Sequence, residues 1–183
     1  MVKNNFELRL LRKLMRLREI TKVNGKLGKK FIGALTVEIL RKELIRRGFN
    51  VSNRDVFIEG SPNEFDLLIL KKGERAKANL LYTPKQVVAA FEIKFSGAFP
   101  GDPEKINSNF QSVKKINKKI RCVYLAISED VKYKYYPEEK KLGDFSCFLL
   151  ARNMELEKAI SRSELKITGD WDKLVGLLNK WKK

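Results

Sequence analysis

The sequence predicts an α/β fold in which a mixed β-sheet is flanked by helices. Two short apolar runs, residues 65–70 and 87–95, are rich in Val, Ile, Leu and Phe and are bounded by turn residues, as β-strands are. Their nearly continuous apolarity indicates a sheet that is covered on both faces. Elsewhere apolar residues recur at helical spacing, and the predicted order is helix, helix, three strands, helix, two strands, helix.

The first predicted helix, residues 6–20, carries two different stripes. Its apolar stripe comprises Phe6, Leu10, Leu14 and Leu17, and its basic stripe comprises Arg9, Lys13 and Arg16. The first 30 residues contain ten basic and two acidic side chains, within a chain of formal net charge +17. We therefore predict that this helix packs with one side and contacts nucleic-acid phosphates with the other. The alternative is a solvated basic face on a packing helix.

A break at residues 23–28, which includes two glycines, precedes the second predicted helix, residues 30–47, and Gly48 ends that helix. Residues 49–60 then resemble a first strand, which a Gly-Ser-Pro-Asn turn joins to the run at 65–70. The polar connection over residues 72–84 is long for a hairpin, so we expect a mobile loop that meets the substrate.

The two apolar runs carry charged residues that would be costly to bury without compensation. Glu92 and Lys94 point to one face of their strand, because side chains alternate with a period of two. In an antiparallel hairpin that aligns Lys71 with Val87, Asp66 lies opposite Glu92. The same register places Glu64 opposite Lys94, a pairing that we also predict.

Opposed residues of an antiparallel pair have Cβ atoms about 5 Å apart, so the carboxylates of Asp66 and Glu92 should converge. Like charges at that distance repel unless a divalent cation lies between them. Oxygen-only ligands suit a hard ion such as Mg²⁺, for which Mn²⁺ should substitute. The alternative is an ordinary cross-strand ion-pair network of Glu92 and Lys94 on a solvated face.

An Asp on one strand followed by Glu-x-Lys on the next, here Asp66, Glu92 and Lys94, resembles the PD-(D/E)XK nuclease superfamily. The proline that commonly precedes the Asp is absent, because Phe65 occupies that position. The resemblance covers about residues 31–152 and implies a restriction endonuclease-like α-β-β-β-α-β core. It also implies a metal-dependent phosphodiesterase in which the three residues are catalytic, and a homodimer.

Glu38 lies at the margin of the apolar stripe of the second helix, from which a carboxylate could reach the hairpin. Many members of the superfamily carry such a helical Glu as an additional metal ligand, so the resemblance implies a site of Asp66, Glu92 and Glu38. The alternative is an ion pair of Glu38 with Arg41 or Lys42.

A third helix is expected to start at Asp102 or Pro103, with an apolar face that includes Phe110 and Val113. Its other side carries basic residues that we assign to nucleic-acid binding, namely Lys114, Lys115 and Lys118. Residues 121–128 and 146–152 are the last predicted strands, and residues 170–183 form a C-terminal helix.

We expect one domain over residues 1–183, with a basic helix and linker at 1–28, a catalytic core at 29–152 and a helical part at 153–183. No apolar run approaches a membrane span, and the N-terminus lacks the apolar segment of a signal peptide, so we expect a cytoplasmic protein without membrane contact. Its two cysteines, Cys122 and Cys147, are expected to be buried free thiols, and the alternative is a disulfide if their two strands are neighbours.

The sequence contains no histidine, which excludes Ser-His and Cys-His catalysis and histidine-based zinc sites. Its strong positive charge indicates a polyanionic partner, for which DNA is the simplest choice. We therefore predict a metal-dependent DNA endonuclease of the restriction type. The alternatives are a Holliday-junction resolvase, an RNA-directed nuclease and a non-catalytic nucleic-acid-binding module.

Overall fold

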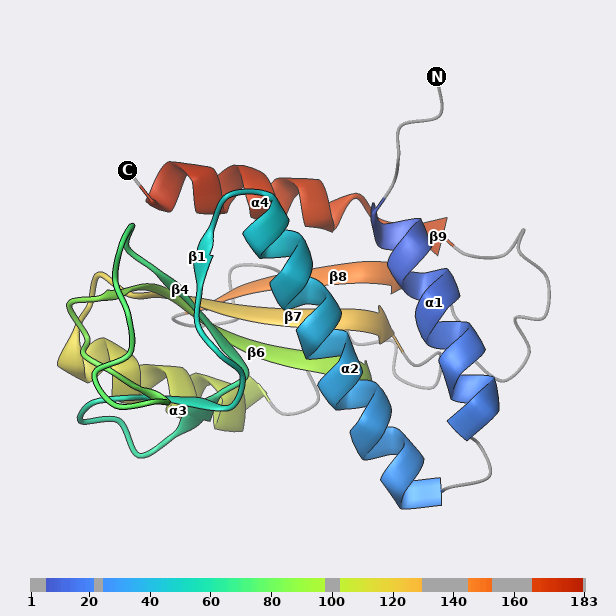
Figure 1. The fold of residues 1–183 in the computed structure, drawn as a ribbon, viewed down its shortest axis with the longest axis horizontal. Helices are drawn as coiled ribbons and strands as arrows, with labels where there is room; N and C mark the ends of the chain where they lie inside the picture. The colour runs from blue at the N-terminus through green and yellow to red at the C-terminus, as the bar shows by residue number, and fades with distance from the viewer. Residues whose placement is uncertain (1–5, 22–24, 98–102, 130–144, 153–165, 183) are drawn as a thin grey trace.

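A computed structural model of the 183-residue chain describes residues 6–21, 25–97, 103–129, 145–152 and 166–182 (Figure 1). Its helices are α1 (Phe6–Thr21), α2 (Gly25–Arg46), α3 (Pro103–Ile116) and α4 (Asp170–Trp181). Its longer strands are β4 (Leu67–Leu70), β6 (Val87–Gly97), β7 (Arg121–Glu129) and β8 (Ser146–Arg152). Its shorter strands are β1 (Asn50–Val51), β2 (Val56–Ile58), β3 (Glu64–Phe65), β5 (Leu81–Tyr82) and β9 (Lys166–Ile167).

The main sheet has six described strands in the order β1-β4-β6-β7-β8-β9. The β1–β4, β4–β6 and β8–β9 pairs are antiparallel, whereas β6, β7 and β8 run parallel to one another. Helix α3 is the crossover between the parallel strands β6 and β7. A small second sheet has the order β3-β2-β5. This mixed α/β architecture confirms the predicted restriction endonuclease-like fold.

The main sheet separates two apolar cores, as its burial on both faces requires. Helices α1, α2 and α4 cover one face, on which they enclose alternate residues of β6 such as Phe91 and Ile93. Helix α3 covers the other face with Phe110 and Val113, which pack near Ala90 of β6 and against residues of the second sheet. We call the face covered by α1, α2 and α4 the α1 face, and the face covered by α3 the α3 face.

A carboxylate joins the two ends of the chain at the α1 face. Glu7 of α1 is only 2% exposed, and it accepts hydrogen bonds from the backbone N–H groups of Gly169 at 3.2 Å and Trp171 at 2.8 Å. These groups lie at the start of α4, where the first N–H groups of a helix have no partner within it. Burial raises the pKa of Glu7, with a smaller contribution from nearby Asp170 and Asp172, although its two backbone hydrogen bonds act in the opposite direction.

Three local predictions need correction. Helix α2 begins at Gly25, not at residue 30, and buried Gly28 lies within it, so burial outweighs the low helix propensity of glycine. The predicted strand at 49–60 is divided into β1 and β2, with Asp55 between them at a left-handed φ of 55°. The connection at 72–84 contains β5, which pairs in parallel with β2 and is therefore part of the second sheet.

Both cysteines are free thiols, as predicted. Cys122 is buried, and burial raises the pKa of Cys147 to about 12. Within the described residues, no helix is both long enough and apolar enough to cross a membrane.

Candidate active site

The β4–β6 hairpin brings Asp66 and Glu92 together in the predicted register. Leu67 pairs with Phe91 and Leu68 with Ala90, so Asp66 and Glu92 follow as the next opposed residues. The backbone N–H of Asp66 donates to the carbonyl of Phe91 at 3.0 Å. A bulge between Ile69 and Leu70 shifts the far end of the hairpin, and Val87 therefore lies opposite Leu70. The predicted pairing of Lys71 with Val87 is wrong by that one residue.

Strand β6 presents Glu92 and Lys94 together, as the period of two predicts. Phe91 and Ile93 belong to the core of the α1 face, so the intervening Glu92 and the following Lys94 point away from that core. Lys94 forms an ion pair with Glu92, and the two side chains are 50% and 21% exposed. The site is therefore reachable from solvent while its carboxylates are partly shielded.

Asp66 is held tightly at the point where the chain enters the main sheet. Its carboxylate Oδ2 accepts a hydrogen bond from the backbone N–H of Ile93 at 2.5 Å. Burial and the negative charge of Glu92 raise the pKa of Asp66 to about 7, although this hydrogen bond and the Lys94 ammonium lower it. A carboxylate that is destabilised in this way favours a cation beside it.

Lys94 remains a cation in this environment. Burial lowers its pKa, but the hydrogen bond and charge of Glu92, together with the charge of Asp66, raise it by more. An ammonium whose pKa is raised stabilises negative charge and donates hydrogen bonds, and it is a poor base at neutral pH. This favours a role in steadying negative charge over a role in deprotonating water.

The predicted pairing of Glu64 with Lys94 is wrong. Glu64 lies in β3, where it pairs with Phe57 of β2 in the second sheet. The chain bends at Asp66, so β3 and β4 enter different sheets. Phe65 packs with Phe110 of α3 at a ring-centroid distance of 6.2 Å, which fixes β3 under that helix.

Asp55 is a neighbour of the site that the sequence did not reveal. The β2–β3 register, Val56 with Phe65, continues to Asp55 opposite Asp66, and the N–H of Asp55 donates to the carbonyl of Asp66 at 3.4 Å. Its charge contributes to raising the pKa of Asp66. Asp55 thus lies opposite Asp66 on the side away from Glu92. The sequence around Asp55 gives no local signal of this placement, because the pairing of Asp55 with Asp66 joins residues of two separate predicted strands.

Two arginine hydrogen bonds, one from α2 and one from the loop itself, brace the loop that carries Asp55 against α2. Arg41 Nε donates to the carbonyl of Ser52 at 2.8 Å, and Arg54 Nη1 of the loop donates to the carbonyl of Ala34 at 2.7 Å. Buried Ser52 in turn accepts a hydrogen bond from the N–H of Leu68 through its Oγ, at 2.8 Å. The helix that precedes the hairpin therefore positions the edge of the site.

Glu38 forms the ion pairs that were its alternative assignment, at 3.6 Å to Arg41 and 3.6 Å to Lys42. Among the described residues, no three Asp, Glu, Cys or His side chains are close enough to form a ready metal cluster. Asp66 and Glu92 supply the paired oxygen donors that a hard divalent ion takes, so the two residues fit such an ion. A ligand role for Glu38 stays a prediction.

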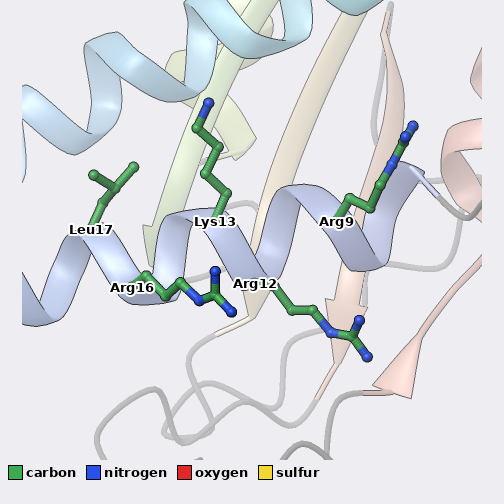
Figure 2. A pocket seen from close by; sticks show the side chains of 5 residues that line it. All are labelled: Arg9, Arg12, Lys13, Arg16 and Leu17. Atoms are coloured by element: carbon green, nitrogen blue, oxygen red, sulfur yellow. The ribbon is translucent and has the colours of Figure 1, made fainter.

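The predicted nucleic-acid-binding residues of α1 line one shallow groove of about 500 Å³, together with Arg12 and Leu17 (Figure 2). Arg9, Lys13 and Arg16 are exposed there. Helix α1 packs on the α1 face, whereas Glu92 and Lys94 point away from that core. The α1 groove and the carboxylate pair therefore belong to different sides of the sheet.

The basic residues predicted for the third helix lie at the C-terminal end of α3 and just beyond it, because α3 ends at Ile116 and Lys118 is in the turn that follows. Lys115 and Lys118 are exposed, and Lys114 Nζ donates to the carbonyl of Lys118 at 3.3 Å. Phe110, one helical turn earlier, packs beside Phe65, the residue that precedes Asp66. Along α3, the basic residues thus begin about one helical turn after Phe110, the residue that packs next to the strand leading into Asp66.

The chain shares its fold with solved NucC structures. These include P. aeruginosa ATCC27853 NucC in its cAAA-bound form, with a TM-score of 0.56 and 12% identity over 96% of this chain and 90% of that chain. E. coli MS115-1 NucC in its cAAA-bound form gives a TM-score of 0.58 and 10% identity over 96% and 89% of the two chains. Its apo form gives 0.53 and 13% over 94% and 92%. No protein-family model and no curated protein sequence matches the chain.

Proposed function

We propose that this protein is a metal-dependent nuclease that hydrolyses DNA phosphodiester bonds. The observation that carries the proposal is the convergence of Asp66, Glu92 and Lys94 at one point of the β4–β6 hairpin. The restriction endonuclease-like fold, which the chain shares with NucC, supports it. The formal charge of +17 fits a polyanionic substrate.

Each residue has a distinct role in this proposal. Asp66 and Glu92 would hold Mg²⁺, with Glu38 as a further proposed ligand. Bound Mg²⁺ would supply Lewis-acid polarisation of the phosphate and a lower pKa for a nearby water. Lys94 donates hydrogen bonds from its ammonium to the phosphate and stabilises the negative charge that develops there. A strand holds this ammonium more precisely than a loop would.

The carboxylate pair also orders the ammonium. The ion pair with Glu92 restrains a long side chain that would otherwise sample many rotamers. The hydrogen bond from the Ile93 N–H holds Asp66 in the same register. The catalytic groups are therefore positioned by the hairpin itself, before substrate arrives.

Separating binding from chemistry tests the proposal. Wild type should cut plasmid DNA with Mg²⁺ or Mn²⁺ and not with EDTA. Glu92→Gln and Lys94→Ala should reduce cleavage by about 10²-fold or more, as loss of a transition-state contact does. Lys94→Ala should still bind DNA within about threefold of wild type, because exposed single charges contribute little to binding of a long polyanion.

The control is Lys77→Ala, which removes a lysine of similar exposure, 55% against 50% for Lys94, that is paired with Glu59 instead. It should cut at the wild-type rate. Four-way junctions, single-stranded DNA and RNA in the same assay distinguish a resolvase and an RNA-directed nuclease from the restriction-type activity. A wild type that cuts none of these substrates, or a Glu92→Gln variant that cuts as well as wild type, would leave a non-catalytic binding module.

A further inference from the structure

A second basic concavity lies at the end of the main sheet where β6 and β7 begin. It has a volume of about 530 Å³, and Val87 and Val88 of β6 lie in its wall. Its charged lining residues come from four separate parts of the chain: Lys71, Lys118, Lys119, Arg121 and Lys180. We call these five residues the basic edge. The described lining contains no acidic residue.

The basic edge lacks the local neutralisation that several other lysines of the protein have. Lys42, Lys77 and Lys173 each form an ion pair with a carboxylate, to Glu38, Glu59 and Asp170 respectively. Within the described part of the chain, no ion pair joins a carboxylate to any residue of the basic edge. Five like charges around one hollow repel one another and create a positive potential that attracts an anion.

The shape of the basic edge indicates an extended anion. Its charges are distributed over the end of β4, the turn after α3, the start of β7 and the last turn of α4. A neighbouring hollow shares Lys71, Asn117 and Lys119 and extends the surface towards Lys85, and its lining also contains one carboxylate, Glu59. One phosphate group cannot contact charges that are spread in this way, whereas a chain of phosphates can.

An aromatic side chain provides a surface for the sugar or base parts of such a chain. Trp181 is half-buried in the wall of the hollow, and the Arg121 guanidinium lies 5.9 Å from its ring centroid. Basic groups beside an aromatic ring are the usual combination in grooves that bind nucleic acid. A membrane offers a flat surface and would not enter the concavity.

We propose that the basic edge binds the sugar-phosphate backbone of nucleic acid as a second contact surface, away from the carboxylate pair. Glu92 lies five residue steps after Val87 along β6, which corresponds to roughly 16 Å of extended strand. A duplex advances about 3.4 Å per base pair along each strand. A nucleic acid that contacts both surfaces must therefore extend about five or more base pairs beyond the carboxylates. The proposal rests on the proposed function only for the identity of the polymer.

The test compares two triple variants that lose the same net charge. The edge variant carries Lys118→Gln, Lys119→Gln and Lys180→Gln, and the control carries Lys42→Gln, Lys77→Gln and Lys173→Gln. Binding to a 30-base-pair and an 8-base-pair duplex is measured by fluorescence anisotropy in EDTA, over a series of salt concentrations. Cleavage is not needed, so the result is independent of catalytic activity.

We expect the edge variant to lose about tenfold or more in affinity for the 30-base-pair duplex, with a salt slope that is smaller by about 2.7, or about 0.9 for each lost phosphate contact. The control should stay within about twofold of wild type in affinity. The two triple variants should differ less on the 8-base-pair duplex, because its roughly 27 Å covers both surfaces in few placements, whereas the 30-base-pair duplex covers both in many. Restoring the three edge positions as arginine should restore the slope.

Tryptophan fluorescence reports occupancy of the basic edge directly. The 30-base-pair duplex should quench wild-type emission, and Trp181→Phe should remove that quenching. Edge and control variants with equal affinity and slope would overturn the proposal, as would emission that does not change. Tighter binding of wild type to anionic vesicles than to DNA, abolished in the edge variant, would overturn it in favour of a membrane. An edge effect in a protein that cuts no substrate would contradict the nuclease proposal alone.

Discussion

Asp66 meets two opposing requirements at the scale of a single residue. Its backbone N–H and its carboxylate both bond to β6, to Phe91 and to Ile93. The same position places a partly buried carboxylate beside Glu92, with Asp55 on the other side. The hydrogen bonds hold the Asp66 carboxylate close to the negative charges of its neighbours, and this repulsion lowers the stability of the folded protein. A cation bound beside Asp66 would remove the repulsion and restore that stability.

The protonation of Asp66 gives this cost a definite sign. Its pKa in the folded protein, about 7, lies above the value of roughly 3.9 expected in the unfolded chain. The folded state therefore binds the proton more tightly. The stabilisation of the folded state by this proton is fully present below about pH 4, and it is lost as the pH rises through about 7.

Asp66→Asn should therefore increase the free energy of unfolding more at pH 8 than at pH 5, by on the order of 1–3 kcal/mol. Asn cannot ionise, and its side-chain oxygen can still accept the N–H of Ile93. Urea unfolding in EDTA at both pH values measures the difference. Adding Mg²⁺ at pH 8 should stabilise wild type and leave the variant unchanged. A variant effect that is the same at both pH values would contradict this account of the residue.

At the scale of elements, α1 and α4 are held together by one buried carboxylate. Glu7 bonds to two backbone N–H groups at the start of α4, and the rings of Phe6 and Trp171 lie 4.6 Å apart at the same junction. Residues distant in sequence thus form one corner of the core. Neither helix was expected to support the other, because a helical periodicity shows which side of a helix is buried and not what covers it.

Glu7→Ala should lower the free energy of unfolding by about 1–3 kcal/mol, because it leaves two backbone N–H groups at the start of α4 without their partner. Glu7→Gln should cost less, since an amide oxygen still accepts one of these hydrogen bonds. Denaturant unfolding measures both. The control is Glu59→Ala, which breaks an exposed ion pair with Lys77 and should change stability by less than about 1 kcal/mol. Equal effects of Glu7→Ala and Glu59→Ala would show that the junction contributes little.

The hairpin of the candidate site could be predicted from the sequence because its signals are local. Apolar runs give the two strands, and the period of two places Glu92 and Lys94 on the same side. The bulge at Ile69 and the bend at Asp66 leave no such local trace. Asp55 escaped notice for the same reason that Glu64 was misplaced, since both depend on β3 leaving the main sheet to pair with β2.

The connection at 72–84 illustrates the same limit. Its polar sequence is typical of a loop, yet β5 within it pairs in parallel with β2, and Lys77 forms an ion pair with Glu59. Parallel pairing joins segments that are distant along the chain, so local composition carries no information on it. The sequence could therefore predict the charged pair of the site and the elements that carry it, but not the second sheet that supports it.

At the scale of the whole molecule, basic charge gathers in two separate regions, on α1 and at one end of the main sheet. The groove of α1 contains Arg9, Arg12, Lys13 and Arg16 on the α1 face (Figure 2), and the basic edge lies at the start of β6 and β7. The carboxylate pair opens away from the core of the α1 face. The α1 groove should therefore contribute to holding DNA on the protein rather than to the chemistry at the scissile phosphate.

Removing α1 cannot test this role, because Phe6, Leu10, Leu11 and Leu14 are buried in the core. Neutralising the exposed charges of α1 can test this role, because it leaves the buried side chains in place. Arg9→Gln, Arg12→Gln and Arg16→Gln together should reduce the slope of log affinity against log salt by up to about 2.7, because each lost phosphate contact contributes about 0.9. The variant should melt within a few degrees of wild type, since these side chains are exposed.

The same variant separates binding from cleavage across the sheet. At protein concentrations that saturate the DNA, its single-turnover cleavage rate should stay within about twofold of wild type, because the altered side chains belong to the face from which Glu92 and Lys94 point away. Gel-shift titrations in EDTA give the salt slope, and rapid-quench measurements with Mg²⁺ give the rate. A rate that falls in proportion to affinity would mean that the α1 groove contacts the DNA at the point of cleavage. An unchanged salt slope would mean that its charges are a solvated surface and that the positive charge elsewhere holds the DNA.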